Sequence, residues 1–465
     1  MVLRRDGPEH NSLGDTNDNR LKNILSSAEV EDVPMKSALV DKIKSLEDRH
    51  TSWRRNCLNM IASENVKSHD VTARLMSDFG NRYVNAYAPV LSSEWKLLDE
   101  VRWYEGLDYI QRVEKICYDL MRRVFRAEFA DYRPISGEIA VVSNWFAFSN
   151  VNDVVMRRSR ADGGHGLLDG LAATTNRKVI DLPFDAREYA IDVDECNKRI
   201  REASPKVIYC GGSNMLFPEP LREISDAAKE TGAYMIYDGS HVMGLIASGK
   251  FQDPLREGVT SLFGSTHKTL PGPQGGLTVS NAGIEIAERL DRTLLGSLID
   301  NYHQNRVAAL AVALVEILRF GTQYAAQIVS NSKALGTSLH EEGFSVLCEH
   351  KGFSASHQVL IDVSKLKVDA KMAAEKLARS NIIANRCPLP GDPSDRARGI
   401  RVGVQEMTRV GMMESEMTHI GELFRRCLID GVRPQLLKKE VTSFRRRFTK
   451  IHYSLNEGAD AYELP

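Results

Sequence analysis

The chain has 465 residues, of which 42% are hydrophobic and 26% charged, proportions that are ordinary for a folded globular protein. Its 61 basic and 62 acidic residues leave a net charge of −1, and no apolar run approaches the roughly 18 residues that span a bilayer, so neither nucleic acid nor a membrane is expected as a partner. Seven cysteines lie scattered without a C-x-x-C pair, which argues against a metal site of the zinc type and predicts free thiols in a reducing, cytoplasmic compartment.

The N-terminal region is predicted to be a tail followed by an arm. Residues 1–33 are rich in polar residues and are predicted to be disordered, and their start lacks the apolar core of a secretory signal. The arm covers 34–70 and is expected to begin with a helix over 34–59, because apolar residues recur there at three- and four-residue spacing. A surface helix and an arm that reaches another subunit both fit this pattern.

A large domain is predicted over 71–320. Residues 88–101 have the character of an insertion, and 107–126 that of a long amphipathic helix. Short apolar runs then alternate with helical stretches such as 221–231, as in a mainly parallel sheet that is covered on both faces. The predicted strands are 178–182, 206–210, 234–237, 261–263 and 276–280.

A smaller α+β domain is predicted over 321–465. A strongly apolar helix over 307–320 is expected to join it to the large domain. The alternating run 357–363 predicts a strand, and 371–379 predicts a helix.

The loop around Lys268 carries the strongest chemical signal. It follows the predicted strand 261–263 and precedes a Gly/Pro-rich turn, and His267 is the only titratable neighbour within four residues. A buried amine of this kind loses its proton readily and can form a Schiff base with an aldehyde, although a lysine in a structural turn is the alternative. Asp238 closes the preceding strand, where an acid can hold the ring nitrogen of pyridoxal phosphate protonated. Lysine and acid in this order predict a site for that cofactor.

The same residues carry a family resemblance. The Asp-x-x-His spacing of Asp238 and His241, the segment 265–270 and the Gly-Pro-x-Gly-Gly after it closely resemble serine hydroxymethyltransferase, a fold-type-I pyridoxal phosphate enzyme. The resemblance extends from about residue 58 to about residue 421 and includes 61–65 and 399–403. It implies an α/β fold with a mainly parallel sheet of the seven-stranded type. It also implies a homodimer with shared active sites, in which the N-terminal arm crosses to the partner.

The resemblance identifies candidates for contacts with the cofactor ring. His165, which follows two glycines, matches the family's histidine that stacks on the ring face. His241 is placed as a second ring neighbour, beside Asp238 and Lys268. A histidine in an ordinary loop is the alternative for His165.

Candidates for the cofactor phosphate come from two segments. Ser136-Gly137 precedes a predicted helix, so backbone N–H groups there can bind an anion. Ser265 and His267 are further candidate donors. Glu138 replaces the hydroxyl residue that is usual in the family and is expected to point elsewhere. The family's glycine-rich intersubunit loop is missing, and His303 or its neighbour Asn301 is expected to replace its contacts.

Candidates for substrate binding and proton transfer complete the site. Arg401 is expected to bind the substrate carboxylate, because a guanidinium pairs with it in bidentate fashion; a surface arginine on an edge strand is the alternative. Ser63 matches a residue near the substrate hydroxyl. Tyr83 matches a family tyrosine that reaches across the dimer interface. Tyr104 matches the second residue of a family tyrosine pair, and Trp103 replaces the first. Asn85 stands where the family has a glutamate that handles protons in the folate-dependent step, and an amide cannot do so.

The predicted reaction makes and breaks the Cα–Cβ bond of a β-hydroxy amino acid through a glycine quinonoid. Because Asn85 and the insertion change the region where folate would enter, the use of tetrahydrofolate is doubtful. The chain is similar to the L-threonine transaldolases in lacking the glycine loop, in its inserted segment and in residues 324–331 and 269–274. We therefore expect small-molecule partners, with threonine as the donor of glycine and another aldehyde as the acceptor.

Three alternatives remain open. The first is tetrahydrofolate-dependent serine hydroxymethyltransferase, which converts serine to glycine. The second is racemisation, decarboxylation or transamination with the same cofactor. The third is a non-catalytic relative that acts as a binding or scaffold subunit.

Overall fold

The computed structural model describes residues 35–85, 104–366, 368–393 and 396–463, so the predicted tail and insertion fall outside the described residues. The chain divides into two units, residues 1–53 and residues 54–465. Helix α2 (Met35–Arg55) supplies the described part of the first unit and matches the predicted helix over 34–59. The elements below belong to the second unit.

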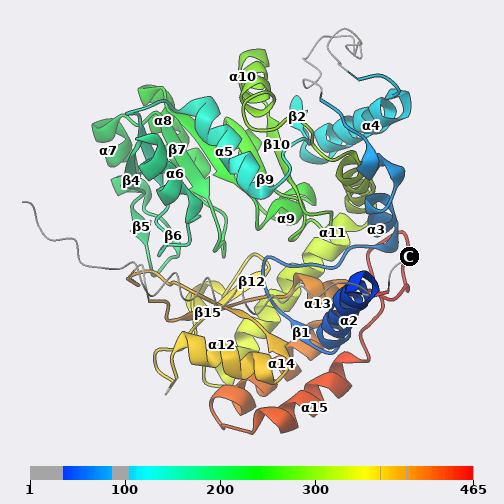
Figure 1. Ribbon diagram of the computed structural model, residues 1–465. Helices are drawn as coiled ribbons and strands as arrows, with labels where there is room; N and C mark the ends of the chain where they lie inside the picture. The colour runs from blue at the N-terminus through cyan, green and yellow to red at the C-terminus, as the bar shows by residue number, and fades with distance from the viewer. Residues whose placement is uncertain (1–34, 86–103, 367, 394–395, 464–465) are drawn as a thin grey trace, which may run out of the picture. The chain divides into compact units, whose positions relative to one another are not determined.

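A seven-stranded sheet with the order β2-β10-β9-β8-β7-β3-β4 forms the centre of the second unit (Figure 1). Its strands are β2 (Phe129–Asp131), β3 (Val154–Arg157), β4 (Lys178–Asp181), β7 (Val207–Gly211), β8 (Tyr234–Asp238), β9 (Ser261–Ser265) and β10 (Gly276–Ser280). Only β10 runs against the others, so the sheet is mainly parallel as predicted. All five predicted strands are present. The sequence pattern missed β2 and β3, which are only three and four residues long.

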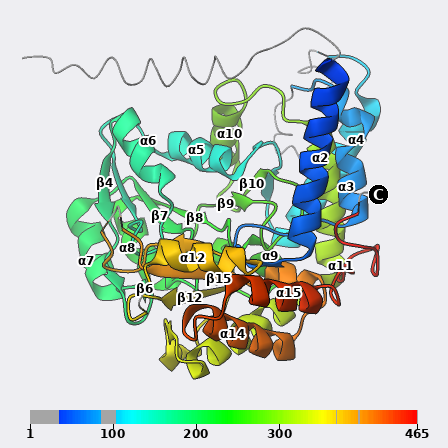
Figure 2. The ribbon, with the colours of Figure 1, turned by 60° about the horizontal axis from the view of Figure 1, so that its bottom comes forward.

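Helices cover both faces of this sheet (Figure 2). Val207, Tyr209 and Phe263 enter one core, whereas Ile208 and Cys210 enter the other, so successive residues of a strand are buried on opposite faces. The first core contains residues of α5 (Gly137–Phe148), α6 (Leu167–Thr175) and α10 (Ile284–Leu294). The second contains residues of α4 (Asp108–Phe125), α7 (Val193–Ala203), α8 (Leu221–Thr231) and α9 (Met243–Ala247). Burial on both faces explains why these strands are continuous apolar runs.

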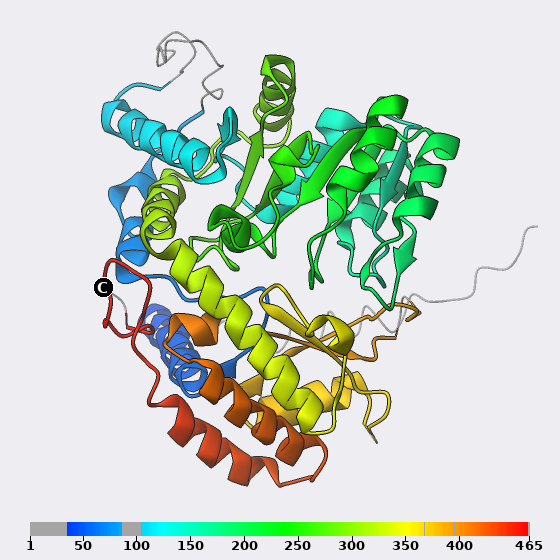
Figure 3. The same ribbon diagram turned by 180° about the vertical axis from the view of Figure 1, so that it is seen from behind.

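Helix α11 (Gln304–Glu341) runs without a break from the large sheet to the C-terminal elements (Figure 3). It is longer than the predicted helix over 307–320, because apolar residues such as Tyr324, Ile328 and Leu335 continue the buried stripe past residue 321. The expected domain boundary near 321 therefore lies inside a helix. By length and hydropathy α11 alone among the described helices could cross a membrane, but 61% of its most apolar window is buried in the fold.

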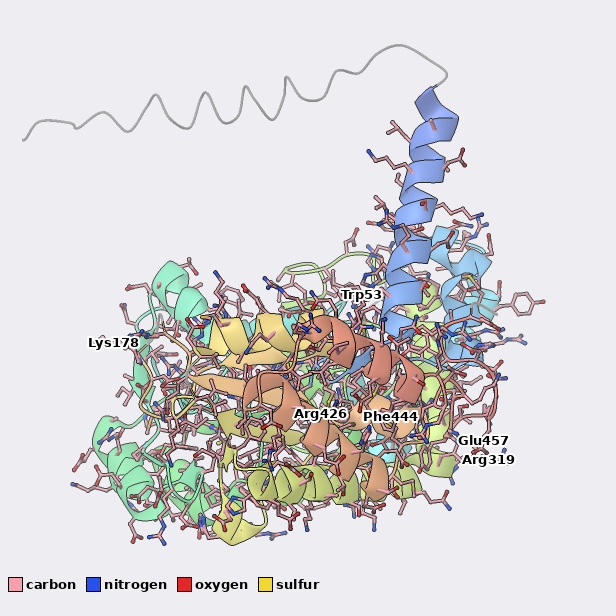
Figure 4. The ribbon with its side chains drawn as sticks, turned by 90° about the horizontal axis from the view of Figure 1, so that it is seen from below. Trp53, Lys178, Arg319, Arg426, Phe444 and Glu457 are labelled. Carbon is pink, nitrogen blue, oxygen red and sulfur yellow. The ribbon has the colours of Figure 1, made fainter. Side chains whose placement is uncertain are left out.

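A four-stranded antiparallel sheet, ordered β11-β12-β15-β14, forms the C-terminal part. Its strands are β11 (Ser345–Val346), β12 (Gln358–Asp362), β14 (Asn385–Cys387) and β15 (Gly399–Gly403), and the helices beside it are α12 (Ala370–Arg379), α13 (Gln405–Arg409), α14 (Glu414–Leu428) and α15 (Pro434–Arg445). The strand and helix predicted over 357–363 and 371–379 are β12 and α12. Arg426 of α14 pairs with Glu440 of α15 at 2.6 Å, near the labelled Phe444 (Figure 4).

Short elements connect these parts. They are β1 (Leu58–Asn59), α3 (His69–Leu75), η1 (Asp78–Asn81), β5 (Phe184–Asp185), β6 (Ala190–Ile191), η3 (Pro254–Arg256), η4 (Glu349–Lys351) and β13 (Ile382–Ile383). Strand β1 pairs in parallel with β13, which ties the segment after α2 to the C-terminal part.

Candidate active site

The candidate site lies at the carboxyl edge of the large sheet. Asp238 is the last residue of β8 and Ser265 the last residue of β9, and the loop after β9 carries Lys268. Strands β7, β8 and β9 are parallel, so their carboxyl ends meet at one edge, where ligands of open α/β sheets bind.

A hydrogen bond to its backbone holds Lys268 in place, and its surroundings lower the pKa of its amine. Its carbonyl accepts a hydrogen bond from Asn65 Nδ2 at 2.7 Å. Burial lowers the pKa of the Lys268 amine to about 8; the Asp238 carboxylate opposes this shift and the Arg401 guanidinium adds to it. The amine is therefore largely available as a neutral nucleophile at mildly alkaline pH.

Asp238 is buried and keeps one oxygen open. Its Oδ1 accepts from the backbone N–H of Ser240 at 3.0 Å. In the described part of the chain no hydrogen bond reaches Oδ2. The carboxylate can therefore accept a second hydrogen bond from a ligand.

His241 is oriented by a buried amide whose own orientation is fixed. Gln358 Oε1 accepts from the N–H of Met215 (2.8 Å), so Nε2 must be the donor to Ser213 O (2.9 Å) and to His241 Nδ1 (2.9 Å). His241 Nδ1 is consequently an acceptor, and the neutral ring carries its proton on Nε2. Burial and the charge of Lys268 hold the pKa of His241 well below its usual value, so the ring stays neutral.

A second histidine, His357, packs behind His241. The two rings stack with centroids 5.6 Å apart, and His357 Nε2 lies 3.1 Å from the carbonyl of Ala62. Burial lowers the pKa of His357 to about 3, so this ring is also neutral. The sequence analysis identified neither His357 nor Gln358 as a site residue, since they stand just before and at the start of the apolar strand β12, with no motif around them.

Arg401 points its guanidinium at neutral groups only. Its Nη1 donates to Ser213 O (2.9 Å) and Asn214 Oδ1 (3.1 Å), and its Nε donates to Asn385 Oδ1 (3.3 Å). Among the described residues no carboxylate pairs with it. Burial lowers its pKa, and such a cation is suited to an incoming carboxylate.

The start of α5 and the end of β9 form a small polar cradle. Ser136 caps the helix, accepting from the N–H of Ile139 at 3.2 Å, and a Cβ on Gly137 would collide with Ser265 Oγ. Only glycine permits this approach. His267 lies near Lys268, and burial lowers its pKa to about 4, with an unpartnered Nδ1 among the described residues.

Glu138 is exposed, but its carboxylate lies close enough to Ser136 to be affected by it, so the expectation that it points elsewhere is not confirmed. Although burial raises it, hydrogen bonds from the residue's own N–H and from Ser136, with the charges of Lys268 and His165, hold the pKa of Glu138 below its usual value. The partial positive charge of a helix N-terminus attracts a carboxylate, which explains this placement.

Tyr83, Asn85 and Asp300 form a separate cluster, which we call the mouth cluster. Tyr83 OH and Asn85 Nδ2 both donate to the Asp300 carboxylate, the latter at 2.8 Å. The Tyr104 ring lies 5.0 Å from that of Tyr83, and both side chains are exposed. The hydrogen bonds from Tyr83 and Asn85 hold the pKa of Asp300 below its usual value, so it stays ionised. The sequence analysis did not identify Asp300, although it singled out Asn301 and His303 of the same segment.

The structure brings some predicted residues together and leaves others apart. One set of residues interacts electrostatically, and we call it the lysine group: Lys268, Asp238, His241, His165 and Arg401. The mouth cluster shares no hydrogen bond or ion pair with that group within the described ranges. The same holds for two other predicted residues. They are Ser63, half-buried in a turn, and His303, exposed at the start of α11 with φ +58°.

The residues fit pyridoxal phosphate, the cofactor that the resemblance implies. Lys268 offers an amine of lowered pKa to the aldehyde, and Asp238 offers an open oxygen to a protonated ring nitrogen. His165 Nδ1 is buried without a partner in the described chain, as expected of a ring neighbour awaiting a ligand. The cradle of Ser136, Gly137 and Ser265 offers donors to the phosphate, provided that Glu138 moves.

Comparisons with known proteins identify the family that the chain resembles. The model of the family described as "Serine hydroxymethyltransferase" matches residues 37–424. Serine hydroxymethyltransferase from Methanothermobacter marburgensis is 43% identical, with 91% of this chain and 97% of that protein covered. Serine hydroxymethyltransferase from Thermococcus kodakarensis is 41% identical, with 90% of this chain and 96% of that protein covered. The crystal structure of L-threonine transaldolase from Pseudomonas fluorescens matches with a TM-score of 0.83 and 28% identity, covering 91% of this chain and 95% of that one.

Proposed function

The chain belongs to the serine hydroxymethyltransferase family of pyridoxal-phosphate-dependent transferases, and we propose that it moves a glycine unit between aldehydes without a folate carrier. The exchange balances as threonine plus an acceptor aldehyde giving acetaldehyde plus a new β-hydroxy amino acid. One Cα–Cβ bond breaks and one forms, and no oxidant is needed.

We call Lys268 and the residues around it, Asp238, His241 and Arg401, the floor of the site. Each of them has a separate role in the proposed reaction. When bound, pyridoxal phosphate withdraws electrons from the Cα of an amino acid attached to it. Lys268 holds the cofactor, and Asp238 keeps the proton on its ring nitrogen. Arg401 binds the substrate carboxylate, while His241 presents its Nε2–H as a donor to the ligand. In this assignment Ser63 is the residue beside the hydroxyl group of the substrate.

The observation that carries the proposal is the chemistry of the mouth cluster. The position of the family's proton-handling glutamate is occupied by Asn85, which cannot take up or release a proton. The neighbouring carboxylate, Asp300, is bound by Tyr83 and Asn85 and has a lowered pKa, so it does not supply an acid near neutral pH. A folate-dependent step therefore lacks its acid–base group, whereas cleavage of threonine does not need that group.

A second copy of the chain completes the site in this proposal. In the mouth cluster Tyr83 and Asp300 are exposed and Asn85 is half-buried, and Tyr104 and His303 are exposed as well. In the described residues none of them has a hydrogen bond or ion pair to Lys268 of its own chain. A homodimer in which these residues reach the partner's site would give each of them a function. We also propose a reducing, cytoplasmic location, since all seven cysteines are free and buried.

The test is release of acetaldehyde from L-threonine by the purified protein, with pyridoxal phosphate present and folate removed. Brisk release, followed by capture of glycine by a second aldehyde, is the expected result. Serine cleavage that appears only when tetrahydrofolate is added would overturn the proposal.

Folate-dependent serine hydroxymethyltransferase is the second candidate. It is favoured by the name shared by relatives of 40–43% identity that are covered almost completely. The two candidates use the same floor residues and differ at the mouth, so the carrier requirement separates them. Another reaction of the cofactor, such as transamination, would be recognised by a keto acid product.

A further inference from the structure

A pocket of about 460 Å³ opens next to Arg401 and His165. The loop after β3, the loop after β7 and strand β14 enclose it. Besides these two residues, Arg160 and Arg386 line the pocket, and no carboxylate is among its described lining residues. We call this the arginine pocket. Arg401 and His165 also belong to the lysine group, so the pocket shares two of its lining residues with the candidate site.

Arg160 lacks an ion pair among the described residues, whereas nearby arginines of the same segment have one. In the same segment Arg157 pairs with Asp169 at 2.5 Å and Arg158 with Glu219 at 2.8 Å. Arg160, two residues further on, forms no ion pair with any described residue. Its side chain lies along the pocket wall, with Cδ 3.6 Å from the position that a Cβ on Gly166 would take.

The opposite wall repeats this contrast. Arg398 pairs with Asp362 at 3.1 Å and also with Asp392. Arg386 is exposed, and no ion pair joins it to another residue in the described ranges. Three neighbouring arginines that do not line the pocket are thus paired, whereas Arg160 and Arg386, which line it, form no ion pair in the described part of the chain.

The number of cations exceeds what the glycine unit needs. A glycine unit carries one carboxylate, which the proposed function assigns to Arg401. Arg401 is held by three neutral acceptors and can bind that anion by itself. Arg160 and Arg386 remain as two guanidinium groups without an anionic partner among the described residues, in the pocket that Arg401 and His165 also line.

We infer, resting on the proposed function, that the acceptor aldehyde carries an anionic group, a carboxylate or a phosphate, which Arg160 and Arg386 bind. Guanidinium groups pair with both anions in planar, bidentate geometry, so the shared chemistry is a multi-oxygen anion. The reaction remains the balanced exchange described above, and the anionic group takes no part in bond making.

The experiment compares two matched acceptors with threonine as donor: 4-formylbenzoate, which is anionic, and its neutral methyl ester. The expected kcat/KM ratio favours the anion by about tenfold at low salt, and the preference shrinks as ionic strength rises. Each of Arg160→Gln and Arg386→Gln should lower the ratio roughly three- to tenfold, while Arg386→Lys should retain most of it. Arg425→Gln, an ion-paired surface arginine on α14, is the control and should leave the ratio unchanged.

A binding measurement makes the test independent of turnover. Terephthalate, which resembles the anionic acceptor but has no aldehyde, should bind the cofactor-loaded protein in calorimetry, more weakly in Arg160→Gln and Arg386→Gln. Comparing glyceraldehyde 3-phosphate with glyceraldehyde then separates a preference for phosphate from one for carboxylate.

The outcomes separate the inference from the proposed function. If no aldehyde of either charge accepts glycine, the proposed function fails, and the terephthalate result still reports on the pocket. If both acceptors react equally well at every salt concentration, and both variants bind terephthalate like the unaltered protein, the inference is overturned while the function stands.

Discussion

The floor of this site and the mouth cluster differ in how their polar groups are held: the contacts of the floor are buried or partly buried, whereas those of the mouth cluster are exposed. At the floor, Lys268, Asp238 and His241 lie at or just after strand ends of one sheet. Hydrogen bonds hold the backbone of Lys268, the carboxylate of Asp238 and the ring of His241. At the mouth, Tyr83 and Asp300 come from distant segments, and their contacts are exposed to water. Buried polar contacts are strong because the alternative is an unsatisfied group, whereas exposed ones are screened and weak.

This difference assigns separate roles to the two regions. The floor supplies chemistry that every member of a cofactor family needs, so its parts must be rigid and complete. In the proposed function, the mouth cluster and the arginine pocket determine which second substrate is used. Substitutions at the floor should therefore abolish turnover, whereas substitutions at the mouth should change selectivity by small factors.

Removing the floor amine should have the largest effect. Lys268→Ala removes the only amine that the lysine group contains among the described residues, and we expect threonine cleavage to fall by at least about 10³-fold. Lys250→Ala, an exposed lysine after α9, is the matched control and should be unaffected. Normal turnover by Lys268→Ala would contradict the assignment of the floor.

Replacing the hydrogen-bond donor to His241 by an acceptor, through a substitution of Gln358, should have the next largest effect. Gln358→Glu keeps an acceptor for the Met215 N–H but removes the donor to His241 Nδ1, so the His241 proton should move to Nδ1. We expect a loss of roughly 10- to 100-fold in kcat/KM. The tautomer is read by ¹⁵N NMR of the cofactor-free protein, a signal that a merely structural defect would not move.

The control for this prediction is Gln323→Glu, the same change at an exposed position of α11. It should alter neither the activity nor the spectrum of His241. A Gln358→Glu protein with full activity and the proton still on Nε2 would show that the amide does not set the tautomer.

The sequence predicted the fold and part of the floor for a physical reason. Strand ends of a parallel sheet share an edge, so Asp238 and Lys268 on successive strands had to approach each other. His357 and Gln358 could not be found this way, because their roles depend on how β12 packs against the loop after β7. The placement of Glu138 also escaped prediction, since the attraction of a helix N-terminus competed with the expected repulsion.

The pKa of Lys268 tests the floor without any cofactor. Burial disfavours the charged amine, so half-protonation is expected near pH 8 rather than at the ordinary value of about 10.4. The Asp238 carboxylate stabilises the charged form, so Asp238→Asn should lower the midpoint further, and Arg401→Met should raise it. A ¹³C NMR titration of labelled lysines, assigned with Lys268→Arg, measures this. A midpoint near 10.4 would mean that the amine is solvated.

Replacing the acid at the cradle should have a smaller effect, in the favourable direction. Glu138→Ser removes a carboxylate from the N-terminus of α5, so pyridoxal phosphate should bind roughly two- to fivefold more tightly. Glu223→Ser removes the corresponding acid in the first turn of α8 and should not change affinity. Cofactor titration by absorbance provides the measurement. Weaker binding by Glu138→Ser would mean that the carboxylate supports the cradle.

A substitution in the mouth cluster should have the smallest effect, and this effect should be on substrate selectivity. Asn85→Glu places a second carboxyl group beside Asp300, and the two like charges raise the affinity of the pair for a proton. The mouth then gains an acid–base group near neutral pH. We expect tetrahydrofolate-dependent serine cleavage to rise a few-fold, while folate-independent threonine cleavage stays within about threefold of its original rate. Asn85→Gln is the control, because it lengthens the side chain and keeps the amide. If Asn85→Gln produced the same gain, shape rather than proton transfer would govern the mouth, and the case for a folate-independent enzyme would lose its support.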